Sequence, residues 1–262
     1  MSTPSPLRIG VCGAAGRMGR EVVAAVAGDD GLVLTAAIDR GHVGEDSGTL
    51  AGIAPNGVPI AGDLPSALTQ ARCDVLVDFT QPDAATENAR RAAQLGVRPV
   101  IGTSGVSAEN RAELDSLLRA NGLGGLLVPN FALGAVLMMR FAAEAAKYYP
   151  NREIIELHHG QKLDAPSGTA IRTAEMMSES AGCAGPKENS AARGAEVCGV
   201  RIHSVRLPGL VAHQEVLFGQ PGELLTIRHD SFDRKCFMPG VLLAIRKVFD
   251  VEGLVVGLEA VL

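Results

Sequence analysis

A glycine-rich turn near the N-terminus constrains the fold more than any other feature of this sequence. The turn Gly13-Ala14-Ala15-Gly16-Arg17-Met18-Gly19 follows an apolar segment, residues 7–11, and precedes a segment with helical spacing, residues 20–27. Glycines at such a spacing let the backbone turn tightly from a strand into a helix and approach a pyrophosphate, which the N–H groups of the helix N-terminus can bind. The turn therefore predicts a dinucleotide-binding α/β domain, although a glycine pattern alone could also be a structural turn.

An acidic residue after the next apolar segment supports the dinucleotide interpretation. Asp39 follows residues 32–38 and lies about 20 residues after Gly19, where an acid can bind the ribose hydroxyls. Arg40 or Arg17 could instead meet the 2′-phosphate of NADP, although Arg40 could also be an exposed loop charge. We expect both NADH and NADPH to be used. The predicted cofactor contacts of this region are Gly13, Gly16, Arg17, Met18, Asp39 and Arg40.

Apolar and amphipathic segments alternate through the first half of the chain. We predict strands at residues 74–79, 99–102 and 126–128, helices at 81–95 and 107–120, and a Gly- and Pro-rich loop at 41–61. Such alternation predicts a Rossmann-like, doubly wound parallel sheet, in which ligands bind at the carboxyl ends of the strands. The loops at those ends add further predicted cofactor contacts: Phe79, Thr80, Gly102, Thr103, Ser104, Pro129, Asn130 and Phe131.

The pattern changes after Asn130. We predict helices at residues 134–149 and 169–180, strands at 153–159, 201–207, 211–218 and 224–227, a small-residue loop at 180–199 and a last helix at 241–250. This mixture favours a second α+β domain with an open mixed sheet. We therefore expect a dinucleotide-binding domain over residues 1–130, a substrate-binding and oligomerisation domain over 131–239, and a C-terminal segment, 240–262, that packs back on the first domain.

Chemistry-bearing side chains gather in one short stretch of the second domain. His158 and His159 end a predicted strand, so their side chains should point to opposite faces. Lys162 follows in a loop, and Ser167-Gly168-Thr169 opens the next predicted helix, where Ser167 or Thr169 can cap it and the N–H groups can bind a carboxylate. Together they offer a proton donor, a cation and an anion site for one small molecule, although a capped helix beside an ordinary histidine is the alternative.

Composition excludes several other classes of protein. The 262 residues are 47% hydrophobic and 20% charged with a net charge of −5, which is typical of a globular protein and disfavours nucleic acid as the main partner. We find no signal peptide or apolar run that could span a membrane, and the scattered cysteines favour free, buried thiols in a cytoplasmic protein. Histidine or cysteine spacing typical of a metal site and the G-x-S-x-G elbow of a hydrolase are also absent.

Taken in order along nearly the whole chain, these motifs resemble the 4-hydroxy-tetrahydrodipicolinate reductase (dihydrodipicolinate reductase) family. The run from His158 to Ala170 is the most specific part of the resemblance. It implies reduction of a cyclic imine dicarboxylate by NADH or NADPH with loss of water, on the diaminopimelate route to lysine, by a homotetramer built through the second domain's sheet. It also implies that His158 and Lys162 are catalytic. The implied substrate contacts are His159, Lys162, Ser167, Gly168 and Thr169.

Two other functions fit parts of the sequence. An aspartate-semialdehyde or homoserine dehydrogenase would share the nucleotide domain, but the semialdehyde enzyme needs a nucleophilic cysteine, and Cys183 and Cys198 lie in a small-residue loop without a paired histidine. A dinucleotide-sensing protein without activity would explain the glycine turn. It gives no reason for a histidine, a lysine and a carboxylate-binding turn in one stretch.

Overall fold

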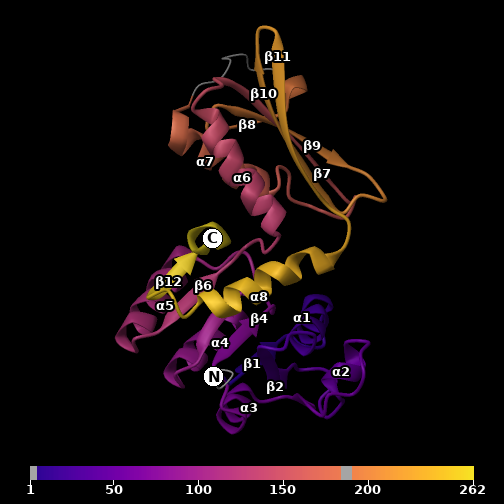
Figure 1. Cartoon of the computed structure of the whole chain (residues 1–262), viewed down its shortest axis with the longest axis vertical. Coiled ribbons are helices and arrows are strands. Elements are labelled where there is room, and N and C mark those ends of the chain that lie inside the picture. The colour runs from indigo at the N-terminus through magenta and orange to yellow at the C-terminus, as the bar shows by residue number, and fades with distance from the viewer. Residues whose placement is uncertain (1–4, 184–190) are drawn as a thin grey trace. The chain divides into compact units, whose positions relative to one another are not determined.

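The computed structural model describes residues 5–183 and 191–262, which form two compact units (Figure 1). The first unit comprises the described residues up to Phe131 together with Phe237–Leu262, and the second unit is Ala132–Cys236. The chain thus leaves the first unit once and returns to it for its last helix and strand.

The first unit is a parallel sheet with helices packed on it. Its strands lie in the order β12-β6-β5-β4-β1-β2-β3, as expected for a doubly wound fold. The strands are β1 (Leu7–Cys12), β2 (Leu32–Ile38), β3 (Ile60–Ala61), β4 (Val75–Asp78), β5 (Arg98–Ile101), β6 (Gly124–Leu127) and β12 (Gly253–Val256). The helices are α1 (Arg17–Ala27), α2 (Ser47–Leu50), α3 (Leu64–Ala71), α4 (Pro82–Gln94), α5 (Ala108–Ala120) and α8 (Met238–Lys247).

Burial explains why these segments form the sheet. Strands that are covered on both faces read as continuous apolar runs, and Ile9 of β1 and Val75 of β4 are fully buried. Helix α1 buries one stripe, Val22, Val23 and Val26, at the spacing of a helix that packs on a sheet. Short connections and right-handed crossovers then bring the carboxyl ends of β1, β2, β4, β5 and β6 to one edge, where the glycine turn lies.

The segment before β4 is more regular than the sequence suggested. The predicted loop at 41–61 contains α2 and β3, and α3 follows it. Asp63 caps α3 by accepting from the Ser66 N–H, Pro65 occupies its first turn, and Arg72 ends it with a left-handed φ of 48°. An Asp followed by an early Pro is a helix-start signal, so α3 could have been found from the sequence.

The second unit is a mixed sheet with two helices on one face (Figure 1). Its strand order is β11-β10-β7-β9-β8, in which the β7–β9 pair is parallel and the other pairs are antiparallel. The strands are β7 (Asn151–His158), β8 (Ala195–Val197), β9 (Val200–Arg206), β10 (Ala212–Gln220) and β11 (Glu223–Ser231). The helices are α6 (Leu133–Ala146) and α7 (Gly168–Ala181). The predicted α/β fold with a second α+β unit is therefore confirmed.

Three details of the second unit differ from the prediction. The small-residue loop at 180–199 contains β8, and its residues 184–190 lie outside the described residues. Cys183 and Cys198 are exposed rather than buried, although all the cysteines are free. Strand β7 ends at His158, one residue before the prediction. In the part of the chain that the structure describes, the helices are too short or too polar to span a bilayer.

Candidate active site

The glycine turn at the start of α1 is closed so tightly that two of its positions require glycine. Gly13 has a φ of +77°, a conformation that side-chain-bearing residues rarely adopt. A Cβ atom at Gly19 would stand 2.0 Å from the Gly13 carbonyl oxygen. The turn therefore needs small residues for its own packing, and the same compactness lets a pyrophosphate approach the backbone.

Asp39 ties the turn to the end of β2. Its Oδ2 accepts the Ala15 N–H at 3.0 Å, and its Oδ1 accepts the Gly41 N–H at 3.0 Å. Helix α1 begins after Gly16, and no side chain caps it. Its first N–H groups therefore face the turn without a side-chain acceptor, as in sites that bind phosphate at a helix N-terminus.

A cavity of about 460 Å³ opens beside this turn, within the range of small-molecule sites. Of the predicted cofactor contacts, Gly13, Gly16, Asp39, Arg40, Phe79 and Thr80 line it. Arg17 and Met18 do not, because they lie in the first turn of α1, where Arg17 is exposed. The wall of the cavity holds two acids, Asp39 and Asp63, two cations, Arg40 and Arg91, and the glycine turn, so the described residues fit a pyridine dinucleotide. Of the two predicted cations, Arg40 lines the cavity and Arg17 does not.

The loops after β4, β5 and β6 come together around Phe79. A Cβ at Gly102 would meet the Phe79 ring at 2.2 Å, and the Phe79 and Phe131 rings lie 5.6 Å apart. The other predicted contacts in these loops lie outside the lining of the cavity: Gly102, Thr103, Ser104, Pro129, Asn130 and Phe131. Their part in cofactor binding stays a prediction.

A buried polar network supports the loop that contains Thr80. This network was not predicted from the sequence. Asp78, which is 1% exposed, accepts hydrogen bonds from the Thr80 N–H at 2.7 Å and from Asn88 Nδ2 at 2.8 Å. Burial raises the pKa of the Asp78 carboxyl, and it also raises the pKa of the neighbouring Cys12 thiol. The network fixes the loop that forms one wall of the cavity, which explains a buried acid at the end of β4.

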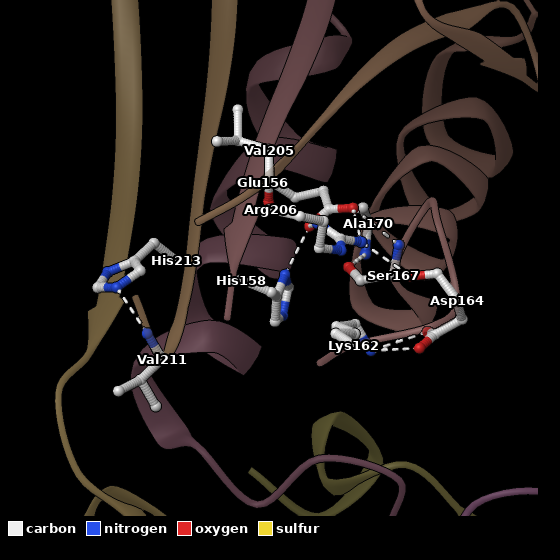
Figure 2. Close-up of polar contacts among 10 residues, drawn as sticks. All are labelled: Glu156, His158, Lys162, Asp164, Ser167, Ala170, Val205, Arg206, Val211 and His213. Carbon is white, nitrogen blue, oxygen red and sulfur yellow. Dashed lines mark hydrogen bonds and ion pairs between the residues drawn. The ribbon is translucent and has the colours of Figure 1, made fainter. Parts of the chain in front are cut away.

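In the second unit, β7 carries His158 on the face that the helices cover. Alternation along the strand gives His158 the same face as Ile154 and Glu156, which are fully buried. His158 Nδ1 lies 2.5 Å from Glu156 Oε2, and Arg206 donates to the same carboxylate at 2.7 and 2.8 Å (Figure 2). His158 is only 14% exposed in its side chain, so the strand and its neighbours hold the imidazole in one orientation.

Lys162 lies in the loop after β7, and Ser167 begins α7. Lys162 Nζ donates to both carboxylate oxygens of Asp164, at 2.7 and 2.8 Å (Figure 2). Ser167 is the N-cap, since its Oγ accepts the Ala170 N–H at 3.2 Å, which settles the choice between Ser167 and Thr169 as the capping residue. The backbone of Gly168 and Thr169 forms the first turn, where N–H groups and the helix dipole favour an anion.

The prediction that His159 ends the strand was wrong. The chain turns after His158, with the Lys162 N–H donating to the His159 carbonyl at 3.1 Å, and His159 is exposed. Its side chain is therefore not set by strand alternation. Glu156 and Arg206 were not predicted as site residues from the sequence. A signal for Glu156 was present, because a charged residue two positions before a candidate catalytic histidine shares its face of the strand.

These features define a class of protein. A doubly wound sheet with a glycine turn, an acid at the end of the second strand and a separate α+β unit that carries a histidine, a lysine and an anion-binding turn is the arrangement of a pyridine-nucleotide-dependent oxidoreductase.

Comparison with known proteins narrows the class to a family. The family model described as dihydrodipicolinate reductase, N-terminus, matches residues 7–131, and the C-terminus model matches residues 134–262. The chain belongs to the dihydrodipicolinate reductase family. It is 52% identical to the 4-hydroxy-tetrahydrodipicolinate reductase of Moorella thermoacetica, over 98% of each chain.

Solved structures agree with this assignment. A dipicolinate-bound dihydrodipicolinate reductase from Paenisporosarcina sp. TG-14 matches with a TM-score of 0.85 and 44% identity, over 98% of this chain and 100% of that one. An amine dehydrogenase from Mycobacterium smegmatis matches with a TM-score of 0.66 and 18% identity, over 97% and 95% of the chains. The second likeness shows only that the fold is shared.

Proposed function

We propose that this chain reduces 4-hydroxy-tetrahydrodipicolinate to tetrahydrodipicolinate with NADH or NADPH, in the diaminopimelate route to lysine. The Moorella thermoacetica relative carries this activity in its name, and the Paenisporosarcina structure holds dipicolinate, a planar dicarboxylate of related shape. The observation that carries the proposal is the cluster of His158, Lys162 and the Ser167 N-cap. His158 and Ser167 both contact Glu156, and Lys162 pairs with Asp164, whose carbonyl accepts from Arg206.

The charges of the reaction match this cluster. The nicotinamide cofactor supplies a hydride, which brings two electrons and no proton. In the overall reaction one proton is also consumed, and the hydroxyl leaves as water. His158 and Lys162 are the groups of the cluster that can hold and give such a proton. An ammonium group and helix N–H groups also offset the two carboxylates of the substrate in a chain of net charge −5.

We assign the substrate contacts to Lys162 and the Ser167–Thr169 turn, with His159 as a further contact from the exposed turn. Lys162 is only 22% exposed in its side chain and has Asp164 as its partner. A substrate carboxylate that binds Lys162 would compete with the Asp164 carboxylate for the ammonium group. The first unit binds the cofactor in this proposal, through Gly13, Gly16, Asp39 and Arg40, and the second binds the substrate.

One experiment tests the proposal directly. The product of dihydrodipicolinate synthase is supplied, and the absorbance of NADH and of NADPH is followed separately. We expect oxidation that depends on the substrate. Cofactor binding without oxidation would favour the dinucleotide-sensing alternative, and no oxidation with either cofactor would overturn the assignment.

We further propose that the protein is a cytoplasmic homotetramer assembled through the sheet of the second unit. Helices cover one face of the sheet in that unit (Figure 1). Among its described residues, Ile155, Leu157 and Leu217 on the other face are partly exposed. Burying such apolar side chains against another copy is favourable. Light scattering should give the mass of four chains, and Leu217→Glu should give a smaller species.

A further inference from the structure

A fully buried carboxylate lies behind the proposed proton donor. Glu156 is 0% exposed, and the reaction proposed above gives it no part. A charge is stable in such a position only when several donors satisfy it. Burial raises the pKa of the Glu156 carboxyl, but hydrogen bonds from His158, Arg206 and Ser204 outweigh it and hold the pKa at about 2. Glu156 is therefore an anion at neutral pH.

An ionised carboxylate can only accept hydrogen bonds, and this fixes the proton on its neighbour. His158 Nδ1 lies 2.5 Å from Glu156 Oε2, so Nδ1 must carry a hydrogen. In the neutral imidazole the other nitrogen, Nε2, is then the unprotonated one. The carboxylate thus determines which nitrogen of His158 is available to exchange a proton with a substrate.

Arg206 holds the carboxylate in this position. Strands β7 and β9 are parallel neighbours, and His158 stands opposite Arg206 in their register. The guanidinium binds both oxygens of Glu156, and its Nη2 also donates to the Asp164 carbonyl at 2.8 Å. A planar fork of this kind restrains a carboxylate more than a single contact can. It also fixes the loop in which Asp164 pairs with Lys162.

The same carboxylate also contacts the anion-binding turn. The Ser167 N–H donates to Glu156 Oε1 at 3.2 Å, and Ser167 is the N-cap of α7. Glu156 therefore contacts the histidine and the turn directly, and it is linked to the lysine loop through Arg206 (Figure 2). Those are the three parts that must keep a fixed geometry around a single small molecule.

We infer that Glu156 is a positioning residue, which fixes His158 as the tautomer with its proton on Nδ1 and leaves Nε2 to carry the proton exchanged with the substrate. Arg206 is the residue that positions Glu156. This inference rests on the proposed function for the reaction itself, whereas the tautomer of His158 can be measured without any turnover.

The decisive variant is Glu156→Gln, which keeps the size of the side chain. Two donors, Arg206 Nη2 and the Ser167 N–H, meet at Oε1, whereas Oε2 receives Arg206 Nη1 beside His158. The amide oxygen should therefore stay at the Oε1 position, and the NH₂ group should turn toward His158 Nδ1. His158 would then accept at Nδ1 and carry its proton on Nε2. The corresponding change of tautomer in a serine protease, a worked example of this effect, costs about 10⁴-fold in kcat.

We expect Glu156→Gln to lower kcat by about 10³- to 10⁴-fold with little change in KM. The ¹⁵N resonances of the His158 imidazole, recorded where it is neutral, should show the proton on Nδ1 in the wild type and on Nε2 in the variant. Glu153→Gln is the matched control, because Glu153 lies on the other face of β7 and also pairs with a histidine, His203, at 2.7 Å. It should keep the wild-type kcat and the wild-type His158 spectrum.

Two results would overturn the inference. One is a Glu156→Gln protein with wild-type kcat and an unchanged tautomer. The other is a wild-type spectrum with the proton on Nε2, which remains decisive even where the variant fails to fold. A wild-type protein that oxidises neither cofactor contradicts the proposed function instead, and it leaves the tautomer measurement intact.

Discussion

Gly19 packs against the Gly13 carbonyl with no room for a single methyl group. The hypothetical Cβ of Gly19 would lie 2.0 Å from that oxygen and 2.7 Å from the carbonyl carbon, both of them backbone atoms that cannot move aside. The contact joins the residue that follows β1 to the first turn of α1, so the shape of the nucleotide site and the packing of the helix depend on the same residue.

Gly19→Ala should therefore weaken both stability and cofactor binding. The clash with backbone should cost about 2 kcal/mol of unfolding free energy or more, and NADH affinity should fall because the turn is pushed out of shape. Chemical denaturation and NADH fluorescence measure the two effects. Gly28→Ala is the control, since a Cβ there meets only ordinary contacts at 3.6 Å. Equal NADH affinity in the two variants would contradict the assigned role of the turn.

Removing either proposed proton donor should affect chemistry more than cofactor binding. His158→Ala and Lys162→Ala should each lower kcat by about 10²- to 10⁴-fold, the usual contribution of a general acid or base. NADH affinity should stay close to that of the wild type. Lys147→Ala is a suitable control, because Lys147 pairs with Glu144 on the exposed surface of the same unit. Wild-type turnover in either variant would remove that residue from the mechanism.

Replacing each of two serine N-caps in turn should distinguish an effect on stability from an effect on substrate binding. Ser167 caps α7 in the second unit, and Ser107 caps α5 in the first by accepting the Asn110 N–H. Replacing either by Ala should cost about 1 kcal/mol of unfolding free energy. Only Ser167→Ala should also raise the substrate KM, by about tenfold, the loss expected for a hydrogen bond to a charged group. A similar KM in both variants would argue against the carboxylate site at α7.

Much of this architecture was predictable because it depends on local patterns. Apolar runs, a glycine turn and an acid after the second strand are enough to predict the doubly wound sheet, and Ser167 has the sequence context of a helix cap. The strands β3 and β12 were missed. Strand β3 has only two residues, too few to show a period. The pairing of the two strands with β2 and β6 comes from contacts between distant segments.

The sequence was enough to predict the reactive residues of the candidate site. It was not enough to predict Glu156 and Arg206, which support them. His158 and Lys162 are found by their proximity in the sequence. Arg206 reaches Glu156 across 50 positions, through the register of β7 with β9, which no local pattern specifies. The exposed position of His159 depends on where β7 ends, and strand ends are poorly determined by sequence.

Cofactor choice should depend on Arg40, because this cation lines the cavity beside Asp39. Arg40→Ala should raise the KM for NADPH by about tenfold or more, since a 2′-phosphate would lose a charge-assisted contact, and should leave the KM for NADH nearly unchanged. Arg17→Ala is the control, because Arg17 does not line the cavity. A wild-type preference above about a hundredfold for one cofactor would contradict dual use, which rests on the neighbouring acid and cation.

The buried carboxylate of Glu156 should make stability depend on acid pH in a defined window. Its pKa falls from an ordinary 4.5 to about 2 in the folded chain, so the folded state binds this proton less readily than the unfolded state. The resulting stabilisation, roughly 3 kcal/mol, is present above about pH 4.5 and is lost as the pH falls toward 2.

The difference in unfolding free energy between wild type and Glu156→Gln isolates this effect from other carboxylates. It should shrink by roughly 3 kcal/mol between pH 5 and pH 2 in urea titrations, because the variant has no proton to bind at this position. The corresponding difference for Glu113→Gln should change little, since that carboxylate is 59% exposed and pairs with Arg90 at the surface. A pH-independent difference for Glu156→Gln would mean that the Glu156 carboxyl has the same pKa in the folded and the unfolded protein, which would contradict the stabilisation of its anion by His158 and Arg206.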